Sequence, residues 1–170
     1  KGASWRLIMS LNPEIIEILK DAEKGASWRL IMSLNPEIIE MAHQNSEFKN
    51  VILESDYFLV DGVGVVLAAQ TLGFAKPTRY TGVDFLTDVI SDASERRLTV
   101  MLIGGKGNVA ERLVDCYRLK YPKLNVIGIE GYKDISNQTK NESERIFSIV
   151  ATTKPHLIFV AFGSPTQELW

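Results

Sequence analysis

A glycine-rich segment, GGKGN at residues 104–108, carries one of the clearest chemical signals in this sequence. It follows an apolar run and precedes a helical pattern, so it is expected to join a strand to a helix. Glycines at such a turn let a phosphate reach the backbone N–H groups at the helix N-terminus. The spacing Gly105-x-Gly107-x-x-Ala110 also fits a dinucleotide fingerprint, with Glu130 near the end of the next strand. We expect a nucleotide diphosphate here; the alternative is a merely tight turn. The residues concerned are Gly104, Gly105, Gly107 and Asn108.

Asp61 and Arg79 are the charged candidates for chemistry in the first half of the chain. Asp61 follows four apolar residues and precedes Gly62, which places a carboxylate at the end of a strand. It can act as a general base that takes a proton from an attacking hydroxyl, or simply cap the helix that follows. Arg79 lies in a loop, where an arginine is usually solvated, although a guanidinium aimed into a cleft would neutralise a phosphate or a carboxylate.

The segment GSPTQE at residues 163–168 is the last candidate. It offers a turn followed by Gln167 and Glu168, whose side chains suit sugar hydroxyls or the edge of a uracil base. The alternative is an ordinary helix start, with Ser164 as the N-cap and Pro165 in the first turn.

These residues must be positioned by alternating strands and helices. Near-continuous apolar runs predict strands, and amphipathic patterns between them predict helices. This alternation indicates an α/β fold, with a Rossmann-like, mostly parallel sheet that has helices on both faces. Ligands in such sheets bind beyond the carboxyl ends of the strands. Asn35, Asp61, Gly104 to Gly107 and Gly163 to Glu168 all fall at such ends. The predicted strands are 29–33, 57–60, 99–103, 124–129 and 156–162.

Three helices carry specific expectations. Asn35 is predicted to cap a helix that begins at Pro36. The apolar segment 62–73 predicts a buried helix. The segment 82–97 predicts an amphipathic helix, whose apolar face would consist of Val83, Leu86, Val89, Ile90 and Ala93.

Composition excludes several classes of protein. The 170 residues carry a net charge of -2, which argues against nucleic acid as a main partner. The single cysteine, Cys116, cannot form an internal disulfide and fits a reducing compartment. With His43 and His156 as the only histidines, a structural zinc site is not expected. No signal peptide and no apolar run of about 18 residues are evident.

The N-terminal segment is unusual. KGASWRLIMSLNPEIIE occurs at residues 1–17 and again, letter for letter, at 24–40. True structural repeats drift in sequence and occur in several copies. We therefore set residues 1–23 apart as a suspect duplicated segment and treat 24–170 as the domain.

Six segments together resemble the WecG/TagA/CpsF family of glycosyltransferases. They occur in the family's order and with matching gaps, from about Trp28 to Trp170. Val60 stands where the family has proline before Asp-Gly, and Ser33 where it has threonine. The segments are SLNPEII, VDGVGVV, RYTGVDFL, LIGGKGNVAERL, LKYPKLNVIGIEGY and FVAFGSPTQELW.

The resemblance implies a function. Family members transfer N-acetylmannosamine or a related sugar from a UDP-sugar to a lipid-diphosphate-linked sugar, with inversion and without a metal or other cofactor. Asp61 matches the proposed catalytic base, and Ser33, Asn35 and Arg79 match pocket residues. The glycine-rich nucleotide loop matches Gly104 to Asn108. The last family block matches Gly163, Pro165, Gln167 and Glu168.

The resemblance also implies a location and an incomplete chain. Family chains continue beyond the position of Trp170 with a basic appendage that contacts the membrane, so we expect residues 24–170 to be a C-terminally incomplete glycosyltransferase domain. The expected location is the cytoplasm, at the inner face of the plasma membrane, where the acceptor would be undecaprenyl-diphosphate-linked GlcNAc. Two alternatives stay open: an NAD(P)-binding oxidoreductase domain with Glu130 on a ribose, and an inactive nucleotide-binding fragment of the transferase.

Overall fold

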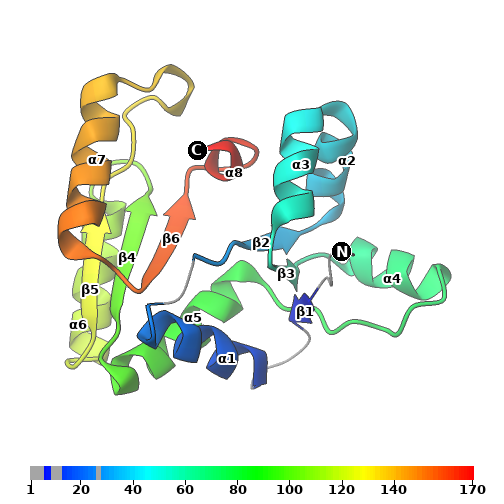
Figure 1. Ribbon diagram of the computed structural model, residues 1–170, viewed down its shortest axis with the longest axis horizontal. Helices are drawn as coiled ribbons and strands as arrows, with labels where there is room; N and C mark the ends of the chain where they lie inside the picture. The colour runs from blue at the N-terminus through cyan, green and yellow to red at the C-terminus, as the bar shows by residue number, and fades with distance from the viewer. Residues whose placement is uncertain (1–5, 9–12, 26–27) are drawn as a thin grey trace.

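A computed structural model describes residues 6–8, 13–25 and 28–170. Strands and helices alternate along most of this length (Figure 1). The elements are β1 (Arg6–Ile8), α1 (Pro13–Glu23), β2 (Ile31–Leu34), α2 (Pro36–Gln44), α3 (Ser46–Glu54), β3 (Tyr57–Val60), α4 (Val63–Thr71), α5 (Gly82–Arg96), β4 (Thr99–Gly104), α6 (Val109–Lys120), β5 (Asn125–Ile129), η1 (Ile135–Asn137), α7 (Lys140–Thr153), β6 (Leu157–Ala161) and α8 (Thr166–Leu169).

The strands form two parallel sheets, in the orders β1-β3-β2 and β5-β4-β6. In the first, Val60 pairs with Leu34, and in the second, Gly104 pairs with Ala161, so neighbouring strands end level with one another. The predicted parallel α/β fold is confirmed. The described strands form two sheets of three, and β2 at the edge of the first does not pair with β6 at the edge of the second.

Helices cover both faces of the first sheet, as predicted. Side chains alternate between the faces of a strand, and all four residues of β3 are buried. Tyr57 and Leu59 pack into a cluster with α1 and α5, whereas Phe58 packs on the opposite face against Phe48 of α3. A strand covered on both faces needs the continuous apolar run YFLV, which is why this segment has no polar alternation.

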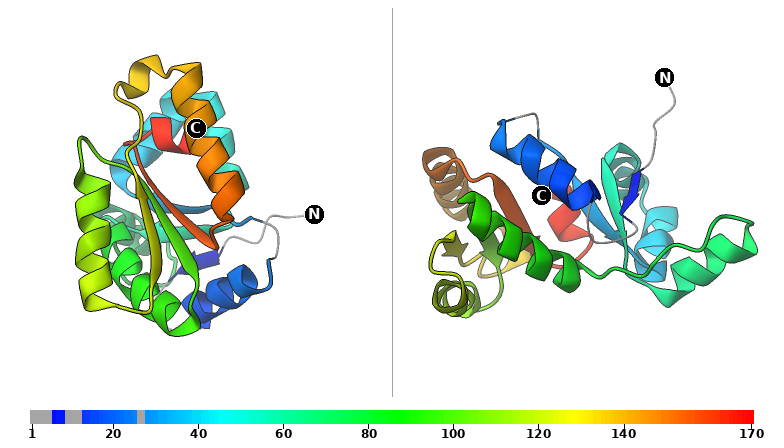
Figure 2. Two further views of the ribbon diagram at one scale, coloured as in Figure 1. Left: turned by 90° about the vertical axis from the view of Figure 1, so that its left-hand side faces the viewer. Right: turned by 90° about the horizontal axis from the view of Figure 1, so that it is seen from below.

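The second sheet is built in the same way. Val100 and Leu102 of β4 pack toward Val114 of α6, while Met101 packs on the other face toward Ile146 of α7. Figure 2 shows α6 and α7 on opposite sides of this sheet. Helix α5 belongs to the same cluster as β3 and β4, so it joins the two sheets into one core.

Part of the duplicated segment is packed into this core. Ile15, Ile18 and Leu19 of α1 are buried in the cluster that contains α5, and α1 lies beside α5 in Figures 1 and 2. In both copies the described residues form a strand and then a helix, and the two strands flank β3. Residues 1–5 and 9–12 of the first copy lie outside the described residues, as do 26–27 of the second.

Two predictions about burial are wrong. Helix α4 forms where it was predicted, but Val66 is its only buried residue. An apolar sequence predicts that a helix is buried, but it does not identify the residues that pack against the helix. Val83 is 73% exposed, although it was placed on the apolar face of α5. It lies in the first turn of that helix, and Phe85 is buried instead.

The first turn of α5 supplies a prediction about pH. Thr81 and Asp84 form a capping box, in which the Asp84 carboxylate accepts from the Thr81 hydroxyl at 2.7 Å. The hydrogen bonds from Thr81 hold the pKa of Asp84 below its ordinary value of 3.8. The carboxylate therefore stabilises the folded state fully above that value, and this contribution is lost as the pH falls below it.

We expect Asp84→Asn to flatten the decrease in the free energy of unfolding below a pH of about 4. Urea unfolding at a series of pH values measures this slope. Glu95→Gln is the matched control, because Glu95 is exposed on the same helix and makes no hydrogen bond or ion pair within the described part of the chain. Equal slopes for Asp84→Asn and the unmodified chain would contradict the assignment.

Candidate functional site

Asp61 lies directly after β3, with its backbone fixed to the neighbouring strand. Its N–H donates to the carbonyl of Leu34 at 3.0 Å, and its side chain is 29% exposed. The N-cap of α4 is Gly62, which provides no side-chain cap hydrogen bond. The interpretation of Asp61 as a helix cap is therefore wrong, because the helix begins one residue later than that role requires. Its carboxylate is left for other contacts.

Arg79 provides one of those contacts. Its Nη2 lies 3.4 Å from Asp61 Oδ1, and its side chain is 53% exposed. The loop is anchored next to β3, because Tyr80 N–H donates to the Val60 carbonyl at 2.8 Å. The Tyr80 hydroxyl donates to Asp88 Oδ2 at 2.6 Å, and burial together with this bond raises the pKa of Tyr80. The tertiary fold thus brings the guanidinium to Asp61, while about half of the Arg79 side chain stays exposed.

Ser33 and Asn35 lie at the end of β2, beside Asp61. Asn35 Oδ1 accepts from Ile38 N–H at 2.9 Å, which confirms the predicted N-cap and leaves the amide NH₂ for a ligand. Ser33 Oγ would lie 3.2 Å from a Cβ placed on Gly82. A Cβ on Gly62 would lie 2.9 Å from Pro36 Cδ, so only glycine allows α4 to start this close to α2.

The glycine-rich loop turns over the end of the second sheet. Gly104, Gly105 and Gly107 all have positive φ angles, of 125°, 78° and 64°. Gly105 N–H donates to the carbonyl of Ala161 at 3.4 Å, which ties the loop to the end of β6. Asn108 occupies the N-cap position of α6 and makes no side-chain cap hydrogen bond, so its amide is not used by the helix.

Lys106 is a candidate phosphate-binding residue that the sequence analysis did not single out. It is exposed in the middle of this loop, between glycines that hold its backbone in the turn. The sequence contained the signal, because a lysine between glycines of a predicted phosphate-binding turn would add charge that backbone N–H groups alone do not supply.

The last block, residues 163–168, folds back on itself. Gly163 N–H donates to Gln167 Oε1 at 3.2 Å, and Gln167 Nε2 donates to Glu168 Oε1 at 2.8 Å. Ser164 Oγ also donates to Glu168 Oε1, at 2.6 Å. The prediction of Ser164 as an N-cap is wrong, since α8 begins at Thr166 after Pro165 and has no side-chain cap. The serine instead orients the Glu168 carboxylate.

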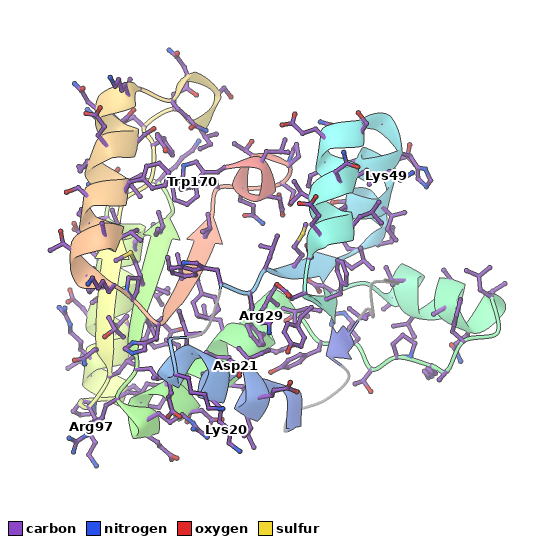
Figure 3. All side chains as sticks on the ribbon, in the orientation of Figure 1. Lys20, Asp21, Arg29, Lys49, Arg97 and Trp170 are labelled. Atoms are coloured by element: carbon purple, nitrogen blue, oxygen red, sulfur yellow. The ribbon has the colours of Figure 1, made fainter. Side chains whose placement is uncertain are left out.

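Aromatic side chains hold this block against the second sheet, a feature that sequence reasoning also missed. Trp170 Nε1 donates to the Tyr132 hydroxyl at 2.6 Å, and its ring stacks on Phe147 of α7 at 5.3 Å between centroids. Figure 3 shows Trp170 directed toward α7. Phe162 packs edge-on against both Tyr132 and Trp170. Tyr132 and Trp170 are 38 positions apart, so no local pattern indicates their contact.

The predicted site residues form two groups. Ser33, Asn35, Asp61 and Arg79 lie at the end of the first sheet, and the glycine-rich loop and residues 163–168 lie at the end of the second. Helix α8 packs against α3, which brings the second group beside the helices of the first sheet (Figure 1). Among the described residues, no hydrogen bond or ion pair directly joins the two groups.

Two further findings concern metals and membranes. The described residues contain no group of three or more His, Cys, Asp or Glu placed to hold a metal ion. No helix in the part of the chain that the structure describes is long and apolar enough to cross a membrane.

Comparison with known proteins gives one family. The profile of the glycosyl transferase WecG/TagA/CpsF family matches residues 8–170. The N-acetylglucosaminyldiphosphoundecaprenol N-acetyl-beta-D-mannosaminyltransferase of Bacillus spizizenii is 31% identical over 129 residues, which are 76% of this chain and 48% of that protein. The protein of the same name from Staphylococcus aureus is 27% identical over the same shares. The chain thus spans about half the length of the curated relatives it matches.

Proposed function

The chain belongs to the WecG/TagA/CpsF family of glycosyltransferases, and we propose that it transfers N-acetylmannosamine, or a related sugar, from a UDP-sugar to undecaprenyl-diphosphate-linked GlcNAc. The observation that supports this best is the Asp61 carboxylate at the end of β3. It is not used as a helix cap, and it lies 3.4 Å from Arg79 beside Ser33 and Asn35. A partly exposed carboxylate at the mouth of the site can accept a proton from a bound hydroxyl, and the guanidinium fixes its position.

The proposed reaction is a single displacement with inversion. Asp61 takes the proton of the acceptor hydroxyl, and the acceptor oxygen forms a bond to the anomeric carbon of the donor. The bond between that carbon and the diphosphate breaks, and UDP leaves with the electron pair. Positive charge develops in the sugar ring while negative charge develops on the diphosphate, so both must be stabilised in the transition state.

Without a metal or other cofactor, the chain itself must neutralise the leaving diphosphate. The backbone N–H groups of the glycine-rich loop can donate to its oxygens at the start of α6, where the helix dipole adds to the attraction. Lys106 is exposed in that loop and supplies a full charge. Arg79 lies beside the Asp61 carboxylate and places a second cation on the acceptor side of the reacting atoms.

The remaining site residues are assigned to the donor. Gln167 and Glu168 are held in one orientation by Gly163 and Ser164, with Pro165 in the connecting turn, and are assigned to sugar hydroxyls or the uracil edge. Ser33 and Asn35 are assigned to the transferred sugar, because they lie beside Asp61. The place of action is the inner face of the plasma membrane, since a lipid-linked acceptor would be held there.

Calorimetric titration tests the nucleotide assignment. We expect saturable binding of UDP and none of NADH, whereas binding of NADH alone would favour the oxidoreductase alternative. Lys106→Ala is expected to weaken UDP binding by about 1.5-fold to 5-fold, the range for an exposed charge pair. Lys123→Ala is the matched control, since Lys123 is exposed at the opposite end of α6. If the chain binds UDP but transfers no sugar, the alternative of an inactive nucleotide-binding fragment is favoured.

A further inference from the structure

Helix α4 is apolar on all sides, and the described structure leaves most of it uncovered. Its residues Val63–Thr71 include no charged side chain, and only Gln70 and Thr71 are polar. Val63 is 62% exposed and Leu67 is 57% exposed. Helices that are apolar all round are normally buried, so this one requires a partner. Figures 1 and 2 show α4 projecting away from the rest of the molecule.

The apolar surface continues into the loop after the helix. Leu72 is 73% exposed and Phe74 is 68% exposed. We call Val63, Leu67, Leu72 and Phe74 the α4 apolar surface. Large apolar side chains gathered in one segment mark an interaction site more often than single exposed residues do.

Two basic side chains, Lys76 and Arg79, lie next to the α4 apolar surface. A groove of about 400 Å³ lies between α4 and the returning loop, lined by Val63, Val66, Leu67, Lys76, Pro77 and Arg79 among others. The sequence from Gly62 to Tyr80 contains Lys76 and Arg79 but no Asp or Glu. The lining of the groove contains two cations and no acid, and of these Arg79 is paired with Asp61 at its edge. Such an apolar groove is complementary to a ligand with an apolar chain and an anionic head.

The groove opens at the proposed base. Arg79 lines it and lies 3.4 Å from Asp61, so a head group bound by Arg79 would place a neighbouring hydroxyl next to the carboxylate. We propose that the α4 apolar surface and this groove receive the polyprenyl chain and the diphosphate of the acceptor lipid. This inference rests on the proposed function and adds the place where the acceptor docks. Lys76 and Arg79 bind the diphosphate, and the apolar surface contacts the polyprenyl chain.

A second copy of the chain is a less suitable occupant. A symmetric contact through α4 would add a second Lys76 and a second Arg79 to the same interface, with no acid from the segment between Gly62 and Tyr80 to pair with them. Like charges across an interface oppose association, whereas a lipid diphosphate neutralises both of them.

Vesicle sedimentation tests the proposal. The probes are phosphatidylcholine vesicles with and without GlcNAc-diphosphoundecaprenol, and phosphatidylglycerol vesicles as a source of negative charge without the acceptor. We expect the chain to bind the acceptor vesicles most tightly. The double substitution Leu67→Gln and Phe74→Gln should lower this binding by about tenfold or more, because each side chain loses most of its apolar transfer free energy.

Controls separate the possible outcomes. Leu119→Gln should bind as the unmodified chain does, because Leu119 is 85% exposed at the far end of α6. Unchanged acceptor binding by the double variant, or equal uptake by phosphatidylglycerol vesicles, would overturn the proposal. So would a dimer in sedimentation velocity that the double variant abolishes without any vesicle binding. UDP titration is run in parallel. If the chain binds no UDP, the proposed function is contradicted. If it binds UDP but the double variant binds acceptor vesicles as the unmodified chain does, only the docking surface is contradicted.

Discussion

Asp61→Asn is expected to lower the rate of sugar transfer by about 10²–10⁴-fold, the usual loss when a general base is removed. The amide has nearly the shape of the carboxylate but cannot accept the proton of the acceptor hydroxyl. Asp61 makes its backbone hydrogen bond to Leu34 through its N–H, which the substitution keeps. The affinity for UDP should therefore change little, and the loss should fall on turnover. Release of UDP from UDP-N-acetylmannosamine, with and without the lipid acceptor, measures it.

The same strand offers a matched control for this substitution. Asp56 precedes β3 and lies 3.0 Å from Arg29, and Figure 3 shows Arg29 toward α1, away from α8 and the glycine-rich loop. Its side chain is 30% exposed, against 29% for Asp61. Asp56→Asn therefore removes a similar carboxylate–arginine pair from the other end of the strand and should leave turnover per folded molecule unchanged. If Asp61→Asn transfers sugar as fast as Asp56→Asn, another group is the base.

Gly104→Ala is expected to have the largest effect on stability among substitutions in the site. Gly104 has a φ angle of 125°, and a Cβ there would lie 2.3 Å from the carbonyl oxygen of Ala161. The backbone of β6 cannot move away without breaking its pairing with β4. Strain and overpacking together should lower the free energy of unfolding by about 2–5 kcal/mol. Urea unfolding measures the loss, and UDP binding should be weakened as well, because the loop proposed to bind the diphosphate starts at this residue.

Gly107→Ala is the control for backbone conformation. Its φ angle is 64°, but nothing lies within 4 Å of the position of a Cβ. The cost should be that of the left-handed conformation alone, about 1 kcal/mol. If the two alanine variants lose equal stability, close packing of Gly104 on β6 does not explain the loss.

Several features could be predicted from the sequence because neighbouring residues determine them. Asn35 and Pro36 start α2 through a cap and a preset φ angle, which involve only the first helical turn. The run YFLV indicates a strand covered on both faces, since no polar residue alternates with the apolar ones. The order of six short motifs, with its resemblance to one family, indicated the family that the profile match shows.

Contacts between distant residues were decided by the tertiary structure. Helix α4 was predicted to be buried, but only Val66 is. An apolar sequence indicates that a helix tends to be buried and does not show which residues cover it. The pairing of Arg79 with Asp61 depends on how the loop after α4 returns to β3, and the bond from Trp170 to Tyr132 on how α8 meets β5 and α7. The division of the strands into two sheets is of the same kind.

The physical reason is the range of the interactions. Caps, turns and side-chain alternation depend on residues a few positions apart, so the sequence by itself determined the elements, the strand ends and the types of candidate residues. Which faces meet depends on long-range packing of the whole chain. Only the tertiary structure therefore decided that Asp61 is paired with Arg79 and that α4 is mostly exposed.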